Sequence, residues 1–196
     1  LDSGSPGLRK AAESALRTMA GADVSAAIAD AMDEASADTR VVLIQILVDR
    51  GAAGALPRIV EVLESSNEEL RTAALKGLRK LGGPDQVSVL VGALQSDSGK
   101  ERRLAESALL AVCRRSGGDV LSPVLEELDA AQEAEVQSPL LRALKAIGGE
   151  KALERAREAV DAGDERVRNT AVRVLSGWPD PEAAPIVIAG DEVENP

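Results

Sequence analysis

Apolar positions recur along the chain with a period of about 31 residues. In every period a leucine stands seven residues after an arginine or a glutamine, and a further, mostly apolar residue follows three positions later. Residues seven and ten positions apart share one face of an α-helix, so each period predicts a helix with one apolar face. The first residues of these series are Arg9, Arg40, Arg71, Arg102, Gln137 and Arg168, and the leucines are Leu16, Leu47, Leu78, Leu109, Leu144 and Leu175.

Each of these helices has start and stop signals. The residues four positions before each arginine or glutamine are mostly of the types that cap a helix N-terminus. Glycines at Gly51, Gly82 and Gly148 follow the apolar stretches, where a left-handed residue commonly ends a helix. Ser98 and Glu101 also have the spacing of a capping box. The expected capping positions are Ser5, Ser36, Asn67, Ser98, Glu133 and Asp164.

A second helical segment lies between successive helices of this kind, as in Leu56, Ile59, Val60 and Leu63. No segment shows the strict alternation of a β-strand. The sequence therefore predicts an all-α fold, an α/α superhelix of about six antiparallel helix pairs over residues 6–190, between a flexible start at 1–5 and a tail at 191–196. We expect the array to be truncated at both ends, with an unpaired outer helix at residues 181–189 and exposed apolar residues such as Leu8, Leu16, Ile186 and Val187.

The segment from Arg71 to Gly82 has the pattern Arg-x-x-Ala-Leu-x-x-Leu-x-x-Leu-Gly. It resembles the HEAT repeat, and its short period is similar to the HEAT-like class that includes phycobilisome lyases. Gln137 in place of arginine and Pro139 within its helix depart from that pattern. The segment Leu175–Asp180 also resembles, over a short stretch, the Trp-Pro-Asp repeats of large exported bacterial proteins. These resemblances imply a repeat scaffold within a longer, multidomain bacterial protein, either cytoplasmic or exported.

Composition narrows the candidate chemistry. The chain of 196 residues is 44% hydrophobic and contains one Trp, no Phe, no Tyr and no His. The lack of histidine removes the commonest general base and metal ligand. No metal-ligand spacing occurs, and no apolar run is long enough to span a membrane. We therefore expect no catalytic residue, cofactor, metal site or membrane insertion.

Three features could have carried chemistry, and each has a structural interpretation. Cys113 could be a reactive thiolate near Arg114 and Arg115, but its equivalents in other repeats are small residues that close a helix. Trp178 could be an interface anchor, yet it occupies an apolar position of the repeat. Pairs of carboxylates such as Glu126 and Glu127 lie on faces that we expect to be solvated.

Charge is divided between the two kinds of helix. The second helices, with residues 181–194 included, carry 20 acidic and 4 basic residues, although the whole chain has 33 acidic and 23 basic ones. In the first helices, the positions one, five and eight residues after each arginine or glutamine are expected to face away from the apolar side. Eight of these eighteen residues are basic and none is acidic: Lys10, Arg17, Lys76, Arg79, Arg103, Arg142, Lys145 and Arg173.

These eight residues are the candidate partner-binding surface. In HEAT arrays, which the chain resembles, one helix of each pair lines the concave side. The arginine-marked helices of this chain correspond to that helix, so the resemblance implies a mildly basic groove. The leading hypothesis is a scaffold that binds an acidic peptide or protein surface there. A charge bias that serves only solubility remains an alternative, as do a bilin-lyase-like enzyme or subunit and a HEAT-like nucleic-acid binder.

Overall fold

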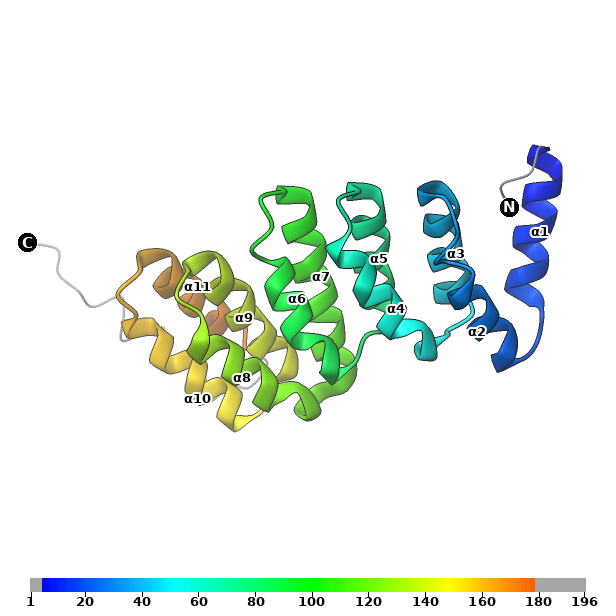
Figure 1. Cartoon of the computed structure of the whole chain (residues 1–196). Coiled ribbons are helices and arrows are strands. Elements are labelled where there is room, and N and C mark those ends of the chain that lie inside the picture. The colour runs from blue at the N-terminus through cyan, green and yellow to red at the C-terminus, as the bar shows by residue number, and fades with distance from the viewer. Residues whose placement is uncertain (1–4, 179–196) are drawn as a thin grey trace, which may run out of the picture. The chain divides into compact units, whose positions relative to one another are not determined.

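The computed structural model describes residues 5–178, which are almost entirely helical and contain no strand (Figure 1). This confirms the predicted all-α fold. The expected helix at 181–189, the tail at 191–196 and residues 1–4 lie outside the described residues. The helices are α1 Pro6–Thr18, α2 Ala22–Asp30, α3 Ala37–Asp49, α4 Leu56–Glu61, α5 Glu68–Leu81, α6 Val87–Ala93, α7 Gly99–Ser116, α8 Leu121–Ala130, α9 Ala134–Ile147, α10 Glu150–Glu158 and α11 Glu165–Ser176.

Odd-numbered helices are the ones that the repeating leucines predict, and we call them inner helices. Even-numbered helices lie between them along the chain, and we call them outer helices. Short 3-10 turns extend the outer helices, at Ala53–Ala55, Val62–Glu64, Pro84–Gln86, Gly117–Val120 and Ala159–Asp161. The described residues thus alternate inner and outer helices, in the all-α solenoid class that the sequence predicts.

The chain divides into two compact units. The first unit comprises the residues up to Gly82 together with Ser96–Ala108, and the second comprises Gly83–Gln95 together with the residues from Leu109 onward. Helix α7 contributes residues to both. Each unit has its own set of fully buried aliphatic side chains.

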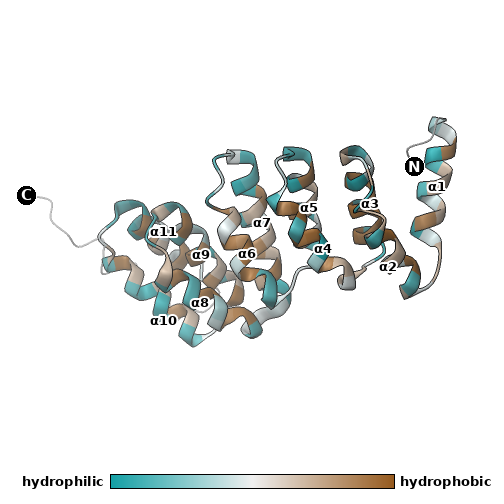
Figure 2. Ribbon diagram, in the orientation of Figure 1, coloured by the Kyte–Doolittle hydropathy of each residue, from teal (hydrophilic) through white to brown (hydrophobic). Residues whose placement is uncertain are grey.

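In the first unit, helices α1, α3 and α5 lie side by side, and α2 and α4 pack against α3 and α5 (Figure 1). The predicted core leucines Leu47 and Leu78 have no exposed surface. Figure 2 shows hydrophobic residues along α3 and α5 and hydrophilic residues at the helix ends. Burial of these aliphatic faces is the main source of stability for helices this short.

Helix α1 is the exception, because none of its residues is buried. Leu8 is 68% exposed, as expected for the first helix, and Leu16 is half-buried. Met19 was expected on the apolar face but is 51% exposed. Helix α1 ends at Thr18, so Met19 no longer follows the helical face that its spacing assumed. The expected exposure of Ile186 and Val187 concerns residues outside the described range.

In the second unit, α9 and α11 lie side by side, α8 packs against α9, and α10 packs against both inner helices. Leu144 and Leu175 are buried, as the period predicts. Trp178 is 9% exposed and therefore belongs to the core, which confirms the structural interpretation of this residue.

Most of the expected helix caps form. Ser36 accepts a hydrogen bond from the backbone N–H of Thr39. Comparable bonds are accepted by the side chains of Asn67, Ser98 and Asp164. Ser5 and Glu133 precede their helices without a side-chain capping bond, so the sequence prediction was wrong for these two.

The glycines that follow the inner helices adopt two different backbone conformations. Gly51 and Gly148 have φ values of 66° and 75°, in the left-handed region that favours glycine. Gly82 ends α5 with φ −58° and ψ 150°, so its expected left-handed conformation is not found. The chain runs on in an extended conformation through Gly83 to Pro84, and proline disfavours a helical conformation in the residue before it.

The arginines that mark the repeats of α3, α5, α7 and α11 share a structural role. Each guanidinium donates to a backbone carbonyl in the turn before its own helix, as Arg71 does to Ser65 at 2.7 Å. Gln137 replaces arginine and donates in the same way to Ala131 at 2.8 Å. This substitution therefore preserves the local contact. The other donors of this kind are Arg40, Arg102 and Arg168.

Candidate functional site

Three of the eight candidate residues converge in the second unit. Arg142 and Lys145 from α9 and Arg173 from α11 line one hollow of about 600 Å³. Arg114 from α7 lines it as well, and no carboxylate is part of its lining. We call this site the α9–α11 hollow. The remaining lining residues are Leu110, Ala146, Thr170 and Val174.

The repeat itself places these charges. Arg142 and Arg173 each stand five residues after the marker of their repeat, on two inner helices that pack side by side. Below them, the Thr170 hydroxyl is 3.3 Å from that of Ser138, and both residues are buried. This polar pair joins α9 to α11 and fixes the base of the hollow. Sequence reasoning had placed Ser138 on the solvated face, which is wrong because α11 covers that side of α9.

The Lys145 side chain lies against Gly177, which follows α11. A side chain added at Gly177 would meet the Lys145 ammonium group, which would have to move aside. The ammonium group also lies near the C-terminal end of α11, where unpaired carbonyls carry partial negative charge and favour a cation.

Arg114 was missed by sequence reasoning. The candidate positions stop eight residues after the repeat marker, because most inner helices end soon afterwards. Helix α7 runs on to Ser116, so Arg114, twelve residues after Arg102, continues the same helical stripe. A count of helix-favouring residues up to the glycine pair at Gly117 would have shown the longer helix.

One end of the α9–α11 hollow adjoins acidic groups. Arg142 and Arg173 also line a neighbouring hollow of about 610 Å³ with Asp164, Glu165 and Arg166. The Asp164 carboxylate accepts backbone N–H bonds at the start of α11. Arg166 forms an ion pair with Glu135. Asp164 is therefore engaged in capping α11, and Arg166 is engaged by a carboxylate of α9.

The first unit distributes its candidate residues differently. Lys76 and Arg79 line a hollow of about 490 Å³ between α3 and α5, together with Lys80 and Lys100. We call this site the α3–α5 hollow. Asp49 and Glu69 also line it, so its charge is mixed. Thr72, which was expected on the solvated face, is buried beside it, because α5 packs laterally against α3.

The remaining candidates do not line either hollow. Arg17 is half-buried and bonds Asp49 at 3.1 Å and Glu13 at 3.3 Å. These carboxylates raise the pKa of Arg17. Arg17 therefore holds α1 to α3 and is not the solvated cation that the sequence suggested. Lys10 and Arg103 are exposed.

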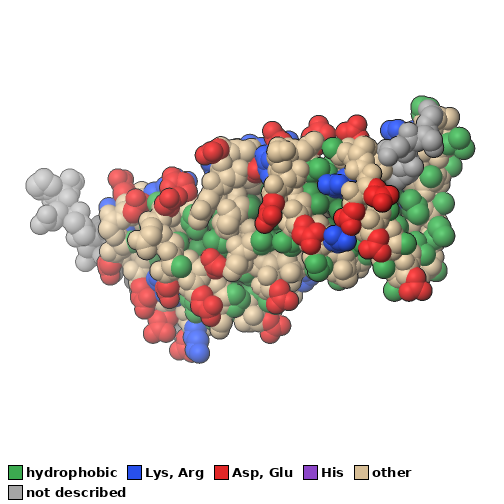
Figure 3. Space-filling view, viewed as in Figure 1, with side chains coloured by type: hydrophobic (Ala, Val, Ile, Leu, Met, Phe, Trp, Pro, Cys, Tyr) green, Lys and Arg blue, Asp and Glu red, His purple; other side chains and the backbone are tan. Residues whose placement is uncertain are grey.

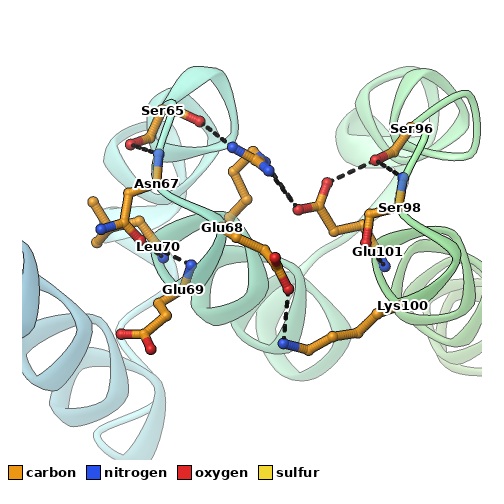
Figure 4. Close-up of polar contacts among 10 residues, drawn as sticks. Ser65, Asn67, Glu68, Glu69, Leu70, Ser96, Ser98, Lys100 and Glu101 are labelled. Carbon is orange, nitrogen blue, oxygen red and sulfur yellow. Dashed lines mark hydrogen bonds and ion pairs between the residues drawn. The ribbon is translucent and has the colours of Figure 1, made fainter.

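An ion pair between a half-buried arginine and a buried carboxylate joins two repeats within the first unit (Figure 4). The guanidinium of Arg71 donates from Nε and Nη2 to Oε1 of Glu101 at 3.0 and 2.7 Å, and Ser96 donates to Oε2 at 2.7 Å. Glu101 is 4% exposed, and the bonds from Arg71 lower its pKa. The expected capping box at Ser98 is thus only half formed, because the Glu101 carboxylate turns to Arg71 and Ser96.

Cys113 is a core residue. It has no exposed surface, and burial raises the pKa of its thiol to about 12. It lies inside α7 and not at its end, so the interpretation as a helix-closing residue was wrong in that detail. The neutral thiol packs as a small apolar group.

We expect Cys113 in the native protein to resist a small thiol reagent at about pH 8, because a neutral thiol is a poor nucleophile. The same residue should react fully once denaturant unfolds the chain. The absorbance of the thiolate that the reagent releases measures the reaction of the native and of the unfolded protein. Rapid reaction of the native protein would contradict the buried position of Cys113.

Other candidate chemistry also has a structural explanation. The Glu68 carboxylate accepts a hydrogen bond from the Lys100 ammonium group at 3.0 Å. The Glu127 carboxylate accepts one from the Ser88 hydroxyl. Residues 5–178 contain no group of three or more Cys, Asp or Glu side chains that could hold a metal ion. No helix in the same range is long and apolar enough to cross a membrane.

Acidic side chains gather on the outer helices of the second unit. Figure 3 shows Asp and Glu over α8 and α10. Glu126 on α8 and Glu154 and Glu158 on α10 are exposed. Within this unit α8 carries three acidic and no basic residues, whereas α10 carries three of each. The acidic excess of the outer helices therefore lies on α8, while the hollow on the inner helices is basic.

Comparisons with known proteins agree with this architecture. The family model described as HEAT repeats matches residues 24–110 and 121–193. An engineered protein has a similar structure, with 18% identity over 90% of this chain and 92% of that one and a TM-score of 0.51. A designed armadillo repeat protein in complex with the peptide (KR)4 has 17% identity over 89% of this chain and 95% of that one, with a TM-score of 0.52.

Human deoxyhypusine hydroxylase is also similar, with 23% identity over 95% of this chain and 73% of that one and a TM-score of 0.46. At 18% and 17% identity, the engineered protein and the designed armadillo repeat protein bear on the fold and not on the activity. None of the curated proteins matches the chain. The match to the HEAT model spans more than half of the chain and agrees with the paired helices, the repeating arginines and the aliphatic core, so the chain belongs to the HEAT repeat family.

Proposed function

We propose that this protein is a binding scaffold that holds an acidic peptide, or an acidic surface of another protein, in the α9–α11 hollow. The observation that carries the proposal is the convergence of Arg114, Arg142, Lys145 and Arg173 around one hollow whose lining contains no carboxylate. Like charges in one hollow repel each other, and an acidic ligand relieves that repulsion.

The hollow also provides more than charge. Leu110, Ala146 and Val174 contribute apolar surface between the basic groups. A peptide can place its carboxylates on the guanidinium groups and its aliphatic carbons on these residues. Arginine is well suited to this role, because its planar fork bonds a carboxylate through two donors. The designed armadillo repeat protein of similar fold, solved with the peptide (KR)4, is an example of a repeat array that holds a peptide.

Binding of nucleic acid and catalysis are less well supported. Single strands are usually held by aromatic stacking, and the only aromatic residue, Trp178, is in the core. Cys113 is buried and neutral, and the chain has no histidine. The proposal is therefore a scaffold without catalytic activity of its own.

We expect Arg173→Glu to weaken binding of polyglutamate by about five- to tenfold, since it replaces an attractive charge by a repulsive one. Arg173 is exposed, so the free energy of unfolding should change by less than about 1 kcal/mol. Isothermal titration calorimetry measures the affinity, which should also fall as salt rises.

Lys151→Glu is the matched control, because Lys151 is an exposed base of the same unit on outer helix α10. It should leave polyglutamate binding within about twofold of the wild type. Equal losses in both variants would overturn the proposal, and so would binding of single-stranded DNA without binding of polyglutamate.

A further inference from the structure

The α3–α5 hollow differs from the α9–α11 hollow in its chemistry. Its volume of about 490 Å³ lies within the range of about 300 to 1,000 Å³ that is usual for ligand sites. It is bounded by inner helices α3 and α5 and by the start of α7, all within the first unit. Its floor is apolar, and its rim carries the charges.

Valines and a leucine form much of that floor. Val41 and Val48 stand at two of the three positions of α3 that the repeat pattern assigns to the solvated face. The equivalent positions of α1 hold Lys10 and Arg17. Val41, Val48 and Leu104 are only half-buried, so apolar surface remains open to a partner.

Thr72 provides a second, independent indication of a ligand. This residue lines the hollow and is 7% exposed, and its hydroxyl oxygen has no hydrogen-bond partner among the described residues. A buried hydroxyl without a partner is costly, and such groups in native proteins call for an explanation. An extended peptide in the hollow could supply the missing partner through its backbone, after a rotation of the threonine side chain.

The rim is predominantly basic. Lys76, Arg79, Lys80 and Lys100 line it, against Asp49 and Glu69. The Asp49 carboxylate is already bonded by Arg17 at 3.1 Å and lies 3.8 Å from the ammonium group of Lys80. Lys76 is exposed and has no ion pair in the described part of the chain. An incoming carboxylate would therefore meet Lys76 next to an apolar floor.

We propose that the α3–α5 hollow binds a linear segment of another protein in which an aliphatic side chain is flanked by Asp or Glu. The aliphatic side chain packs on Val41, Val48 and Leu104, and a flanking carboxylate binds Lys76. This assignment names a partner class for the proposed scaffold function but uses a separate hollow. It can hold even if the α9–α11 hollow binds nothing.

The observations favour this occupant over a nucleic acid. Phosphates would leave the valines and Leu104 without apolar contact. An acidic segment without an aliphatic side chain would likewise leave the floor unused. Both elements, the side chain and the carboxylate, are needed to match the hollow.

The test uses three twelve-residue peptides and the whole chain in isothermal titration calorimetry. The first peptide has a central leucine flanked by Asp and Glu, the second has serine at the centre, and the third has Asn and Gln in place of the acids. We expect the second and the third to bind at least about tenfold more weakly than the first, because each lacks one of the two matched elements.

Val48→Ser and Lys76→Gln should each weaken binding of the first peptide by about five- to tenfold. Val172→Ser is the matched control, since Val172 is a 40% exposed valine on α11 outside either hollow, and it should have no effect. Circular dichroism of each variant verifies that the fold is retained. Equal binding of the leucine and serine peptides would overturn the inference, as would an affinity that depends on Arg173 and not on Val48, which would leave the proposed function intact.

Discussion

Replacement of Glu101 by alanine should lower the free energy of unfolding by about 3 kcal/mol, because it leaves the half-buried guanidinium of Arg71 and the hydroxyl of Ser96 without their buried carboxylate partner. Glu101 is 4% exposed and accepts hydrogen bonds from both Arg71 and Ser96. Urea denaturation followed by circular dichroism measures the loss. For a chain of this size the corresponding fall in melting temperature is about 6 to 12 °C.

The dependence on pH provides an internal check. Because Arg71 lowers the pKa of Glu101, the stabilisation is fully present above the unfolded value, near pH 4.5, and is lost as the pH falls through the lower folded value. The wild type and Glu101→Ala should therefore differ most near neutral pH and converge in acid. A difference that stayed constant from about pH 7 to about pH 3 would show that the charge is irrelevant.

Glu68→Ala is the matched control, since Glu68 pairs with Lys100 on the same two helices (Figure 4). Both side chains of that pair are 54% exposed. Water screens such a pair, so its loss should cost less than about 1 kcal/mol. A loss as large as that of Glu101→Ala would mean that the buried position of Glu101 is not what matters.

Replacement of Arg50 by leucine should detach helix α1. Arg50 stands at a position that is apolar in most repeats, yet it bonds the carbonyls of Leu16, Met19 and Gly21. It also donates to the Ser25 hydroxyl at 3.0 Å. Helix α1 buries none of its own residues, so the bonds to Leu16 and Met19 and the pair between Arg17 and Asp49 are the polar contacts that hold it to α3. We expect a loss of about 2 to 3 kcal/mol in the local stability of α1.

Hydrogen exchange of the α1 amides measures that change directly, and their protection should fall while that of α5 stays the same. Arg58→Leu is the control, because Arg58 forms only exposed ion pairs with Asp33 and Glu61. It should have little effect on either helix. If Arg50→Leu stabilised α1 instead, leucine would be the better residue there, as the repeat pattern alone suggests.

The sequence predicted the fold well because one period contains both the helical face and its boundaries. The repeating leucines, from Leu47 to Leu175, are buried as the pattern requires. The pattern failed where contacts between neighbouring repeats decide the outcome. Thr72 and Ser138 are buried by the lateral packing of inner helices, which the period of a single helix cannot express.

The candidate site was predicted only in part, for the same reason. Arg142, Lys145 and Arg173 do meet in one hollow, but Arg17 is engaged by Asp49 from the next inner helix. Arg114 entered the site through an unusually long helix, and not through its repeat position. Helix length and contacts across repeats therefore separate the basic residues that line a hollow from those that hold the array together.

The position of Trp178 gives the protein a natural optical reporter. It is the only aromatic residue in the chain, it is 9% exposed, and it belongs to the second unit. Its emission therefore senses that unit alone, whereas the peptide absorption band sums over all helices. If Trp178 fluorescence and peptide absorption report the same unfolding transition, the two units unfold together as one cooperative block. If the transitions differ, the units on either side of the boundary near Gly82 unfold separately.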